Sequence, residues 1–528
     1  MVFPLFALMS KSMQNADGVF VGFQNFVAYS KEPTLFKSFF HSLFVASAST
    51  IIVVCLGFLY AFALQCTCIR FKGFFRVVAL IPLLSPSILA AIALVYWFGN
   101  QGILKSLLMG NPIYGPIGII MASVYWTFPH ALMILSTSLS LSDARLYEAS
   151  EALKASKLKT FLNVTLPGAK YGIISTTFVV FILVFTDFGV PKVIGGNYNV
   201  LATDIYREVV GMQNFQMGAV ISIVLLIPAL LAFVLDQYSR KRQASQLSSR
   251  SVVYKPKPDK GRDNLFFAYC LLITLLIVAM LGMAQFGALV KFWPYNLSLT
   301  LKHYNFEVAG LGWDSFLNSV RMSLYAAFFG TILIFVGSYL IEKMRSDKSL
   351  REILQMVALM PMAIPGIVLG LAYIFFFNAK GNPLNFFYAT MAILVINTIV
   401  HFYTVSHLSA ITAIKKLDNE FEAVSLSLKI PIYKMFFRVT LPVCLPTVFD
   451  IFIYLFCNAM TTVSGVIFLY SYDTTLASVS AIHLDEQGDV AGAAAMAMLI
   501  VYISFVVRGL HTVISTLLLK RTQAWRNI

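Results

Sequence analysis

The apolar positions of the chain form continuous runs instead of alternating with polar positions. Several runs reach about 20 residues, the length at which an α-helix crosses a bilayer core of about 30 Å. Membrane-spanning strands would give an alternating pattern instead. The runs predict twelve candidate helices, at residues 1–9, 40–66, 74–98, 115–140, 169–191, 217–238, 265–287, 318–341, 351–377, 386–411, 444–470 and 490–518. We therefore expect an all-α polytopic membrane protein with about twelve transmembrane helices.

The first of these segments is too short to span a bilayer. It offers about nine residues before Lys11, which gives roughly 14 Å of helix at 1.5 Å per residue. Either the chain starts upstream of Met1, or the segment is a stub packed on the other helices. The first alternative is favoured, because the segment resembles the second half of a normal helix.

A polar segment divides the apolar runs into two halves. Residues 239–264 are rich in Ser, Pro, Lys and Arg and have no apolar period, which is typical of a flexible surface linker. The halves on either side each hold about six candidate helices. We expect a first repeat at residues 1–238, this linker, and a second repeat at residues 265–528.

The two halves also repeat in sequence. "VALIPLLSPSILAAIALVYW" at 78–97 matches "VALMPMAIPGIVLGLAYIFF" at 357–376, with Pro82 opposite Pro361 and Pro86 opposite Pro365. Prolines inside buried helices can simply kink them. Because both halves have the same orientation, they should be related by an axis along the membrane normal, with a transport pathway on that axis.

Composition and charge agree with this picture. The 528 residues are 59% hydrophobic and only 12% charged, whereas soluble domains contain about 25% charged residues. The net charge of +15 does not indicate nucleic-acid binding, because Lys and Arg lie in short tracts between apolar runs, as the positive-inside rule describes. These tracts are residues 70–76, 145–170, 239–264, 343–351, 415–438 and 520–526. Placing all of them in the cytoplasm predicts one topology with both chain ends cytoplasmic.

The cysteines and histidines do not form a metal-binding pattern. Cys66 and Cys68 have no second ligand pair at zinc spacing, and the other cysteines lie mostly in apolar runs. His130, His401 and His407 are interpreted as satisfied contacts between helices. We expect no metal site in this chain.

Each half carries one polar, amphipathic insert in a predicted cytoplasmic loop. The first reads "YEASEALKASKLKTFLNVTLP" at 147–167, and the second reads "FEAVSLSLKIPIYKMFFRVTLP" at 421–442. Apolar residues recur at helical spacing, which predicts a short helix, a turn and a second helix that ends at Leu-Pro. An interfacial helix lying on lipid is the alternative. The occurrence of one insert per half, each beginning with a carboxylate among bases, weakens that alternative.

The inserts resemble the cytoplasmic signature of ABC importer permeases, which is Glu-Ala-Ala, three residues, Gly, and then a Leu-Pro about a dozen residues later. In that family the signature forms a coupling helix that docks on the ATPase subunit. The residues that match, or that occupy a signature position, are Glu148, Ala149, Lys154 and Pro167 in the first half and Glu422, Ala423, Lys429 and Pro442 in the second. Both Lys residues stand where the family has Gly. Gly permits a positive φ, which Lys tolerates less well, so the turn geometry stays open.

The resemblance covers nearly the whole chain and implies a fold, a function and partners. It implies a fused permease with two parallel six-helix repeats of the type I, MetI-like kind, as in ferric-iron and 2-aminoethylphosphonate importers of the bacterial inner membrane. "TDFGVPKVIGG" at 186–196 resembles both groups, and residues 458–502 resemble the phosphonate group more. The expected substrate is therefore a phosphonate or phosphate ester, with ferric iron second. The expected partners are two ABC ATPase copies, a periplasmic or lipid-anchored solute-binding protein and membrane lipid.

The chain is not expected to bind nucleotide itself. It contains no Gly-Lys dipeptide and so no phosphate loop of the usual kind. ATP and magnesium should be bound by the partner ATPase, and this chain should be a transport subunit and not an enzyme.

A few polar residues in the apolar segments are candidates for the solute pathway. They are Asp187, Asn458, Thr461, Thr462 and Ser464. Charged residues within spans are rare and often functional, but polar residues also join helices by hydrogen bonds. For Asp187 the structural alternative is a paired carboxylate, with Lys192 as its partner.

Two other classes of protein compete with the permease interpretation. A secondary transporter driven by an ion gradient would explain parallel six-helix halves, but not the duplicated insert. It would also need an intramembrane relay of ionisable residues, and few are present. A membrane scaffold or sensor would need no polar axis at all.

Overall fold

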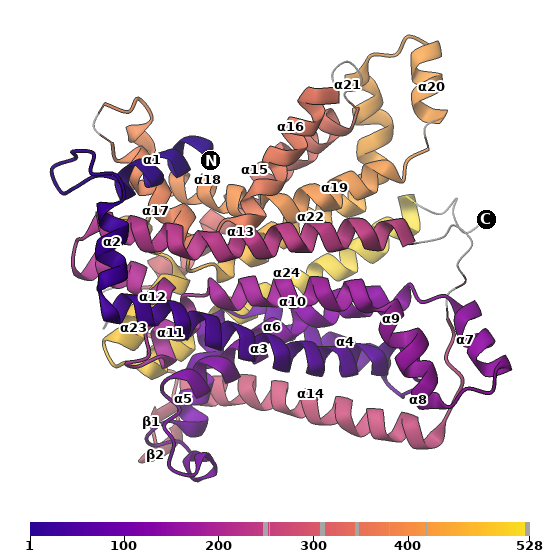
Figure 1. The fold of residues 1–528 in the computed structure, drawn as a ribbon, viewed down its shortest axis with the longest axis horizontal. Coiled ribbons are helices and arrows are strands. Elements are labelled where there is room, and N and C mark those ends of the chain that lie inside the picture. Colours follow the sequence, from indigo (N-terminus) through magenta and orange to yellow (C-terminus); the bar gives the residue numbers. More distant parts are fainter. Residues whose placement is uncertain are drawn as a thin grey trace. The chain divides into compact units, whose positions relative to one another are not determined.

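The computed structural model describes residues 1–246, 252, 254–306, 312–343, 348–379, 381–418 and 420–522, and these are mainly helical (Figure 1). The two strands among them, β1 (Val290–Phe292) and β2 (Asn296–Leu299), form one antiparallel pair. The fold class expected from the apolar runs is thus confirmed.

Seven helices within the described residues are long and apolar enough to cross a membrane. They are α3 (Pro33–Cys66), α6 (Pro116–Ser140), α13 (Phe215–Gln246), α14 (Lys260–Leu289), α15 (Asp314–Lys343), α22 (Leu441–Thr461, preceded by a helical turn) and α24 (Val490–Thr522). Four bent helix pairs raise the number of possible spans to eleven. With the short apolar α1 (Val2–Ser12), these elements account for the twelve predicted segments.

Four of the possible spans in the described residues are bent helix pairs. The pairs are α4 (Lys72–Leu80) with α5 (Ser87–Phe98), α8 (Lys157–Thr160) and α9 (Leu166–Gly168) with α10 (Lys170–Phe185), α16 (Lys348–Leu359) with α17 (Gly366–Phe377), and α18 (Met391–His401) with α19 (Tyr403–Lys415). The remaining α-helices of the described residues are α2 (Gln24–Lys31), α7 (Ala144–Ala152), α11 (Gly189–Ile194), α12 (Leu201–Tyr206), α20 (Glu420–Ser427), α21 (Ile432–Met435) and α23 (Ala477–Glu486).

The repeated prolines produce the sharpest bends. The α4–α5 pair bends by 100° and the α16–α17 pair by 110°. Pro86 and Pro365 have extended backbone angles and directly precede α5 and α17. The residue before a proline is disfavoured in the helical region, so the helix must end there and restart. The paired kinks predicted from the sequence repeat are therefore present.

The chain packs into two compact units. The larger unit contains Met9–Asn305 and Ala481–Met498, and the smaller unit contains Met1–Leu8, Phe306–Ser480 and Leu499–Ile528. Helix α14, which the sequence places first in the second half, packs on α3, α4 and α5 in the larger unit. Division by packing thus differs from division by sequence repeat, and the repeat limits stay a prediction.

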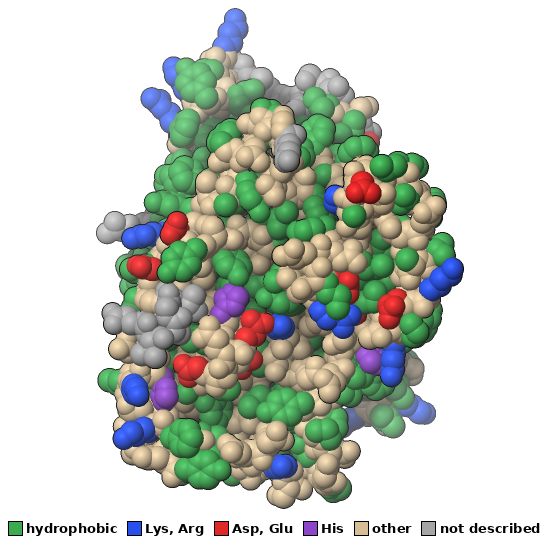
Figure 2. Space-filling view, turned by 90° about the vertical axis from the view of Figure 1, so that its left-hand side faces the viewer, with side chains coloured by type: hydrophobic (Ala, Val, Ile, Leu, Met, Phe, Trp, Pro, Cys, Tyr) green, Lys and Arg blue, Asp and Glu red, His purple; other side chains and the backbone are tan. Residues whose placement is uncertain are grey.

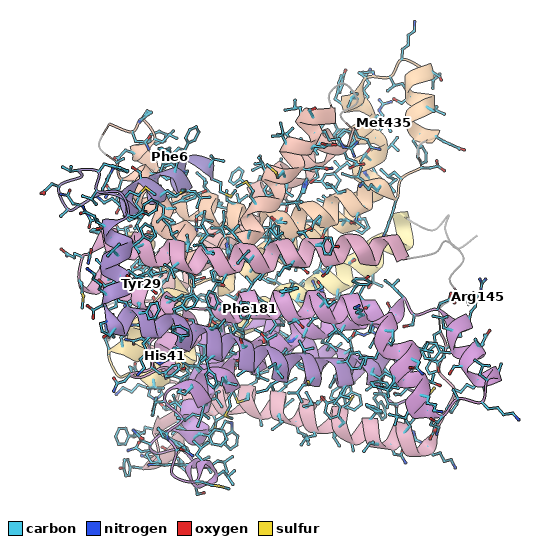
Figure 3. The ribbon with its side chains drawn as sticks, viewed as in Figure 1. Phe6, Tyr29, His41, Arg145, Phe181 and Met435 are labelled. Carbon is cyan, nitrogen blue, oxygen red and sulfur yellow. The ribbon has the colours of Figure 1, made fainter. Side chains whose placement is uncertain are left out.

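Small residues meet where α3 packs on α6 in the larger unit. Helices α3 and α6 share the most extensive interface, and a methyl group on Gly57 would lie 3.2 Å from Cβ of Ala131. Small residues at such crossings let helix backbones approach closely in lipid, where packing replaces the hydrophobic effect. The resulting helix bundle holds α7 and α8 at one end of this unit and β1 and β2 at the other (Figure 1). Figure 3 places Arg145 at the first end, and Tyr29 and His41 toward the second.

Candidate functional site: the two inserts

The first insert is a short capped helix that ends in a left-handed turn. Asp143 caps α7, because its side chain accepts a hydrogen bond from the Arg145 amide at 3.1 Å. Lys154 then has a φ of +52°. The Ala155 amide donates to the Ser150 carbonyl at 3.0 Å, and the Lys154 amide donates to the Glu151 carbonyl at 2.9 Å. This is the Schellman arrangement, in which a residue in the left-handed region terminates a helix.

The second insert repeats this geometry. The side chain of Asp418 accepts from the Glu420 amide at 3.1 Å at the start of α20. Lys429 also has a φ of +52°, and the Ile430 amide donates to the Ser425 carbonyl at 2.8 Å. Both inserts therefore form the turn that a glycine would favour, with Lys in its place. The geometry that the sequence left open is the same in both halves.

The two Glu-Ala pairs do not occupy equivalent positions. Counted from the left-handed Lys, Ser150 corresponds to Ser425, and both side chains are buried at 8% exposure. Pro167 and Pro442 follow their Lys at the same separation. On this count Tyr147 corresponds to Glu422, and Glu148 to Ala423. The Glu-Ala pair of the second insert therefore lies one residue farther from its Lys than the pair of the first insert.

Beyond the turn, both inserts pass through a π-helical segment into the next helix. These segments are Phe161–Thr165 and Phe436–Thr440, and each directly precedes a Leu-Pro. Proline is suited to the first turn of a helix, because its missing N–H would be unsatisfied there. The hydroxyl of Tyr147 donates to Oγ1 of Thr165 at 3.0 Å, and burial raises its pKa to about 12.

The tips of both inserts expose large apolar side chains beside charged ones. Leu153 is 82% exposed and Leu158 is 68% exposed, and their counterparts Leu428 and Tyr433 are 66% and 61% exposed. Exposed apolar groups gathered in one place mark surfaces that contact protein or membrane. The motif residues Glu148, Ala149, Lys154, Pro167, Ala423, Lys429 and Pro442 are also exposed. The backbone of Glu422 belongs to α20, but its side chain lies outside the described part of the structure.

Asp187 acts as a helix cap in the larger unit. Its Oδ2 accepts from the Val190 amide at 3.0 Å at the start of α11, and its Oδ1 accepts from the Ser87 hydroxyl at 3.3 Å. Lys192 is the partner of Asp187 in the structural alternative, and the structure does not show that pair. Lys192 pairs instead with Glu486 at 2.6 Å, and its Nζ lies 4.7 Å from the centre of the Tyr206 ring.

The polar candidates of the second half bond mainly to nearby backbone. The Asn458 amide group donates to the Tyr454 carbonyl at 2.8 Å, and the Thr461 hydroxyl donates to the Cys457 carbonyl at 3.1 Å. The Thr462 carbonyl accepts from Ser478 at 2.6 Å. The hydroxyl of Ser464 would lie 2.8 Å from a methyl group placed on Gly366. A role of these residues in the pathway stays a prediction.

Sequence reasoning overlooked one buried residue beside this group. Asn397 is 1% exposed, and its amide donates to the Gly465 carbonyl at 2.8 Å. The position of an amide side chain within an apolar run is the feature of the sequence that could have identified Asn397.

Of the histidines, His407 is a satisfied helix contact as expected, because its Nδ1 lies 2.7 Å from the Ser338 hydroxyl. His401 differs from expectation, since its buried Nδ1 has no hydrogen-bond partner among the residues described.

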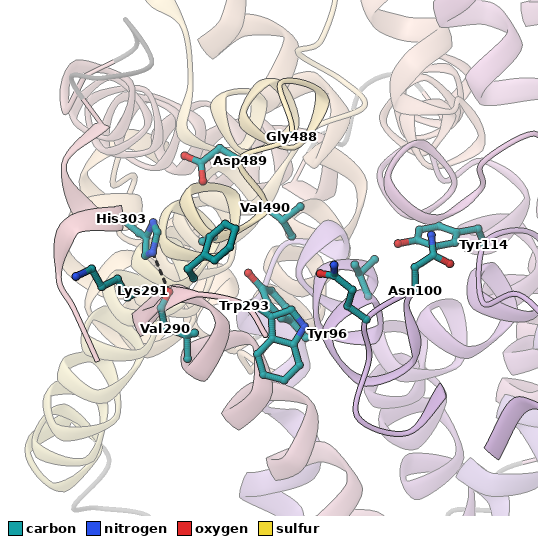
Figure 4. Close-up of a pocket in the computed structure, with 14 residues that line it drawn as sticks. Tyr96, Asn100, Tyr114, Val290, Lys291, Trp293, His303, Gly488, Asp489 and Val490 are labelled. Carbon is teal, nitrogen blue, oxygen red and sulfur yellow. Dashed lines mark hydrogen bonds between the residues drawn. The ribbon is translucent and has the colours of Figure 1, made fainter. Parts of the chain in front are cut away.

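A cavity of about 520 Å³ lies at the β1–β2 end of the larger unit, far from the first insert (Figure 4). Its lining includes Tyr96, Tyr114, Trp293 and Asp489. His303 at its edge bonds to the Val290 carbonyl at 2.8 Å. Figure 2 shows the side of the molecule on which this end lies, with acidic, basic and histidine side chains scattered among hydrophobic ones. No group of three or more His, Cys, Asp or Glu residues suited to a metal occurs within the described ranges.

One family model matches both halves of the chain. Residues 55–245 and 322–520 each match the family model "Binding-protein-dependent transport system inner membrane component". The ferric transport system permease protein FbpB of Actinobacillus pleuropneumoniae is 27% identical over 470 residues, which cover 86% of this chain and 67% of the relative. The putative ferric transport system permease protein FbpB 1 of Haemophilus influenzae is 28% identical, covering 83% of this chain and 70% of the relative. The spermidine/putrescine transport system permease protein PotB of Escherichia coli is 27% identical and covers 42% of this chain and 82% of the relative.

Proposed function

Because the chain belongs to the family of binding-protein-dependent transport system inner membrane components, we propose that it is the fused permease of an ABC importer for ferric iron. Two ferric transport permeases match more than four fifths of the chain, whereas the polyamine permease PotB matches less than half. This supports ferric iron as the substrate. The phosphonate preference expected from residues 458–502 has no support among these relatives.

The duplicated insert is the observation that carries the coupling role. Each repeat presents one short helix with a left-handed Lys turn and exposed apolar residues at its tip. One ABC ATPase copy would dock on each insert, so two copies would bind one permease chain. ATP and magnesium would belong to the ATPase, because this chain has no phosphate loop.

Motion of the inserts would reach the pathway through the helices that follow them, across a 61° bend before α10 in the first half. Each insert runs through a π-helical segment into a long apolar helix, α10 in the first half and α22 in the second. Closure of the ATPase pair would move both inserts and the helices attached to them, which is a rigid-body route to alternating access. A solute-binding protein would deliver ferric iron at the opposite face. The inserts and both chain ends would then face the cytoplasm.

The test is ATP-driven uptake in proteoliposomes that contain the full chain, its ATPase and the iron-loaded binding protein. We expect ferric iron to accumulate, and we expect Leu153→Glu combined with Leu428→Glu to lower uptake at least 100-fold by placing charges on both docking tips. Leu107→Glu, at an exposed leucine outside the inserts, is the matched control and should leave ATPase binding unchanged. Uptake of polyamine but not iron would overturn the substrate assignment. Full uptake by the double variant would overturn the coupling role.

A further inference from the structure

Part of the polar linker packs directly against the first insert. We call Val252 and residues 254–259 the linker segment. The Ala144 amide donates to the Val252 carbonyl at 2.8 Å, and the Tyr254 amide donates to the Ser142 carbonyl at 3.3 Å. The linker segment therefore pairs through its backbone with the residues that begin α7. The expectation of a flexible loop fails for this part of the linker.

A ring contact joins the linker segment to the middle of α7. The rings of Tyr147 and Tyr254 stack with centroids 3.8 Å apart and planes 19° apart. Tyr147 is in turn bonded to Thr165 of the π-helical segment. Stacked aromatic pairs contribute about 0.5–1.5 kcal/mol beyond area burial. Tyr254 thus supports the helix before the turn and, through Tyr147, the segment after it.

Charged side chains connect the linker segment to both sides of the turn. Lys257 pairs with Glu151 of α7 at 2.7 Å, and Asp259 pairs with Lys157 of α8. At least one side chain of each ion pair is exposed to solvent, so each ion pair contributes little by itself. Together the two ion pairs connect the linker segment to α7 and α8.

The far end of the linker segment is fixed to the helix bundle. The Cys68 thiol donates to the Pro256 carbonyl at 3.3 Å, and the Cys68 amide donates to Oδ1 of Asp263 at 3.2 Å. Asp259 caps α14 by accepting from the Arg262 amide at 3.2 Å. The insert is therefore connected through the linker to the end of α3 and the start of α14.

Among the described residues, α20 and its turn have no comparable support; the ring contacts of Phe436 with Phe335 and Tyr339 of α15 lie beyond the turn. The hydrogen bonds of α20 and its turn join residues 418–430 to one another. The position of Tyr147 is taken by Glu422, so the aromatic partner needed for stacking is missing from the sequence. In Figure 1, α20 lies beyond the end of α19, next to α21.

We infer that the linker segment completes the first ATPase-docking surface, so that this permease presents two unequal docking surfaces. This inference rests on the proposed function. The first surface consists of α7, its turn and the linker segment, with the exposed Lys257 paired to Glu151, and it is held in place before the ATPase arrives. The second surface consists of α20 and its turn alone. A pre-ordered surface loses less conformational freedom on binding, so the first surface binds the ATPase more tightly.

The test removes one docking surface at a time in the full chain. Leu428→Glu leaves only the first surface, and Leu153→Glu leaves only the second. Adding Tyr254→Ala should weaken binding of the isolated ATPase about tenfold in the Leu428→Glu background and less than twofold in the Leu153→Glu background. Tyr254→Phe keeps the ring and should restore affinity. Equal effects of Tyr254→Ala in both backgrounds, or no effect in either, overturn the inference. If neither Leu→Glu change weakens ATPase binding, the docking role itself fails.

A second measurement needs no partner and separates docking from misfolding. Cys68 lies half-buried under the linker segment. A hydrophilic maleimide applied to the cytoplasmic side should label it at least fivefold faster in Tyr254→Ala than in the wild-type chain. Tyr433→Ala, an exposed tyrosine of the second insert, is the matched control and should not change the rate. Equal labelling of Cys68 in the wild type and Tyr254→Ala would show that the linker segment is not docked.

Discussion

The two inserts share a backbone but differ in what surrounds them. Lys154 and Lys429 have the same left-handed φ, and each insert continues through a π-helical segment to a Leu-Pro. Only the first insert, within the described residues, is stacked, ion-paired and hydrogen-bonded to a distant segment. The repeat has thus kept the local geometry that a docking helix needs, while the support for that geometry comes from tertiary contacts that one half has and the other lacks.

Replacing the left-handed Lys residues should show the difference between the inserts most clearly. A non-Gly residue in the left-handed region costs of order 1–3 kcal/mol, and a β-branched residue fits it poorly. Lys429→Val should speed hydrogen exchange of residues 420–430 about tenfold, because α20 has no outside support. Lys154→Val should speed exchange of residues 144–155 only about threefold, because the linker segment holds α7.

The matched controls are Lys154→Gly and Lys429→Gly. Glycine adopts this φ without strain, so neither change should speed exchange of its insert. Hydrogen exchange and mass spectrometry on the full chain in nanodiscs measure all four variants. A larger effect of Val at 154 than at 429 would reverse the comparison.

Local patterns in the sequence were sufficient for the elements but not for the support of the inserts. The apolar runs predicted the spans, and the repeated prolines indicated kinks at two of the four bent pairs, because both features depend on residues close together in the chain. The sequence does not decide the geometry of the two Lys turns, because the preference of Lys argues against a positive φ. The hydrogen bonds to the Ser150 and Ser425 carbonyls establish that geometry. The docking of Tyr254 on Tyr147 joins residues far apart in sequence, in a segment whose polar composition is typical of a flexible linker.

Reversing one ion pair should sharpen the comparison by a smaller amount. Lys257 pairs with Glu151 in a solvent-exposed position, and such pairs contribute little individually. Lys257→Glu should weaken ATPase binding to the first surface by about threefold or less and should speed labelling of Cys68. The double variant Glu151→Lys with Lys257→Glu should restore labelling to the wild-type rate. The matched change Lys434→Glu in α21 should leave Cys68 labelling unaltered. A double variant that labels as fast as Lys257→Glu would show that the pair does not act as a unit.

The smallest expected effect is that of pH on linker docking. A hydrogen bond from Lys157 lowers the pKa of Asp259 below its usual 3.8. A hydrogen bond to Glu151 raises the pKa of Lys257 above 10.5.

These directions fix the pH range in which the linker segment stays docked. A carboxylate with a lowered pKa stabilises docking above its free value of 3.8 and loses that contribution as pH falls through the lower, docked value. An amine with a raised pKa stabilises docking below pH 10.5 and loses that contribution as pH rises through the higher, docked pKa.

A nitroxide attached at Lys255→Cys should therefore give an unchanged EPR line shape from about pH 5 to 9. The spectrum should become more mobile only as the pH falls below 3.8 or rises above 10.5. The same label at Lys434→Cys, on the second insert, should be as mobile at neutral pH as at either extreme. A transition near pH 6.5 at the first insert would mean that a histidine controls docking, contrary to the contacts formed by the linker segment.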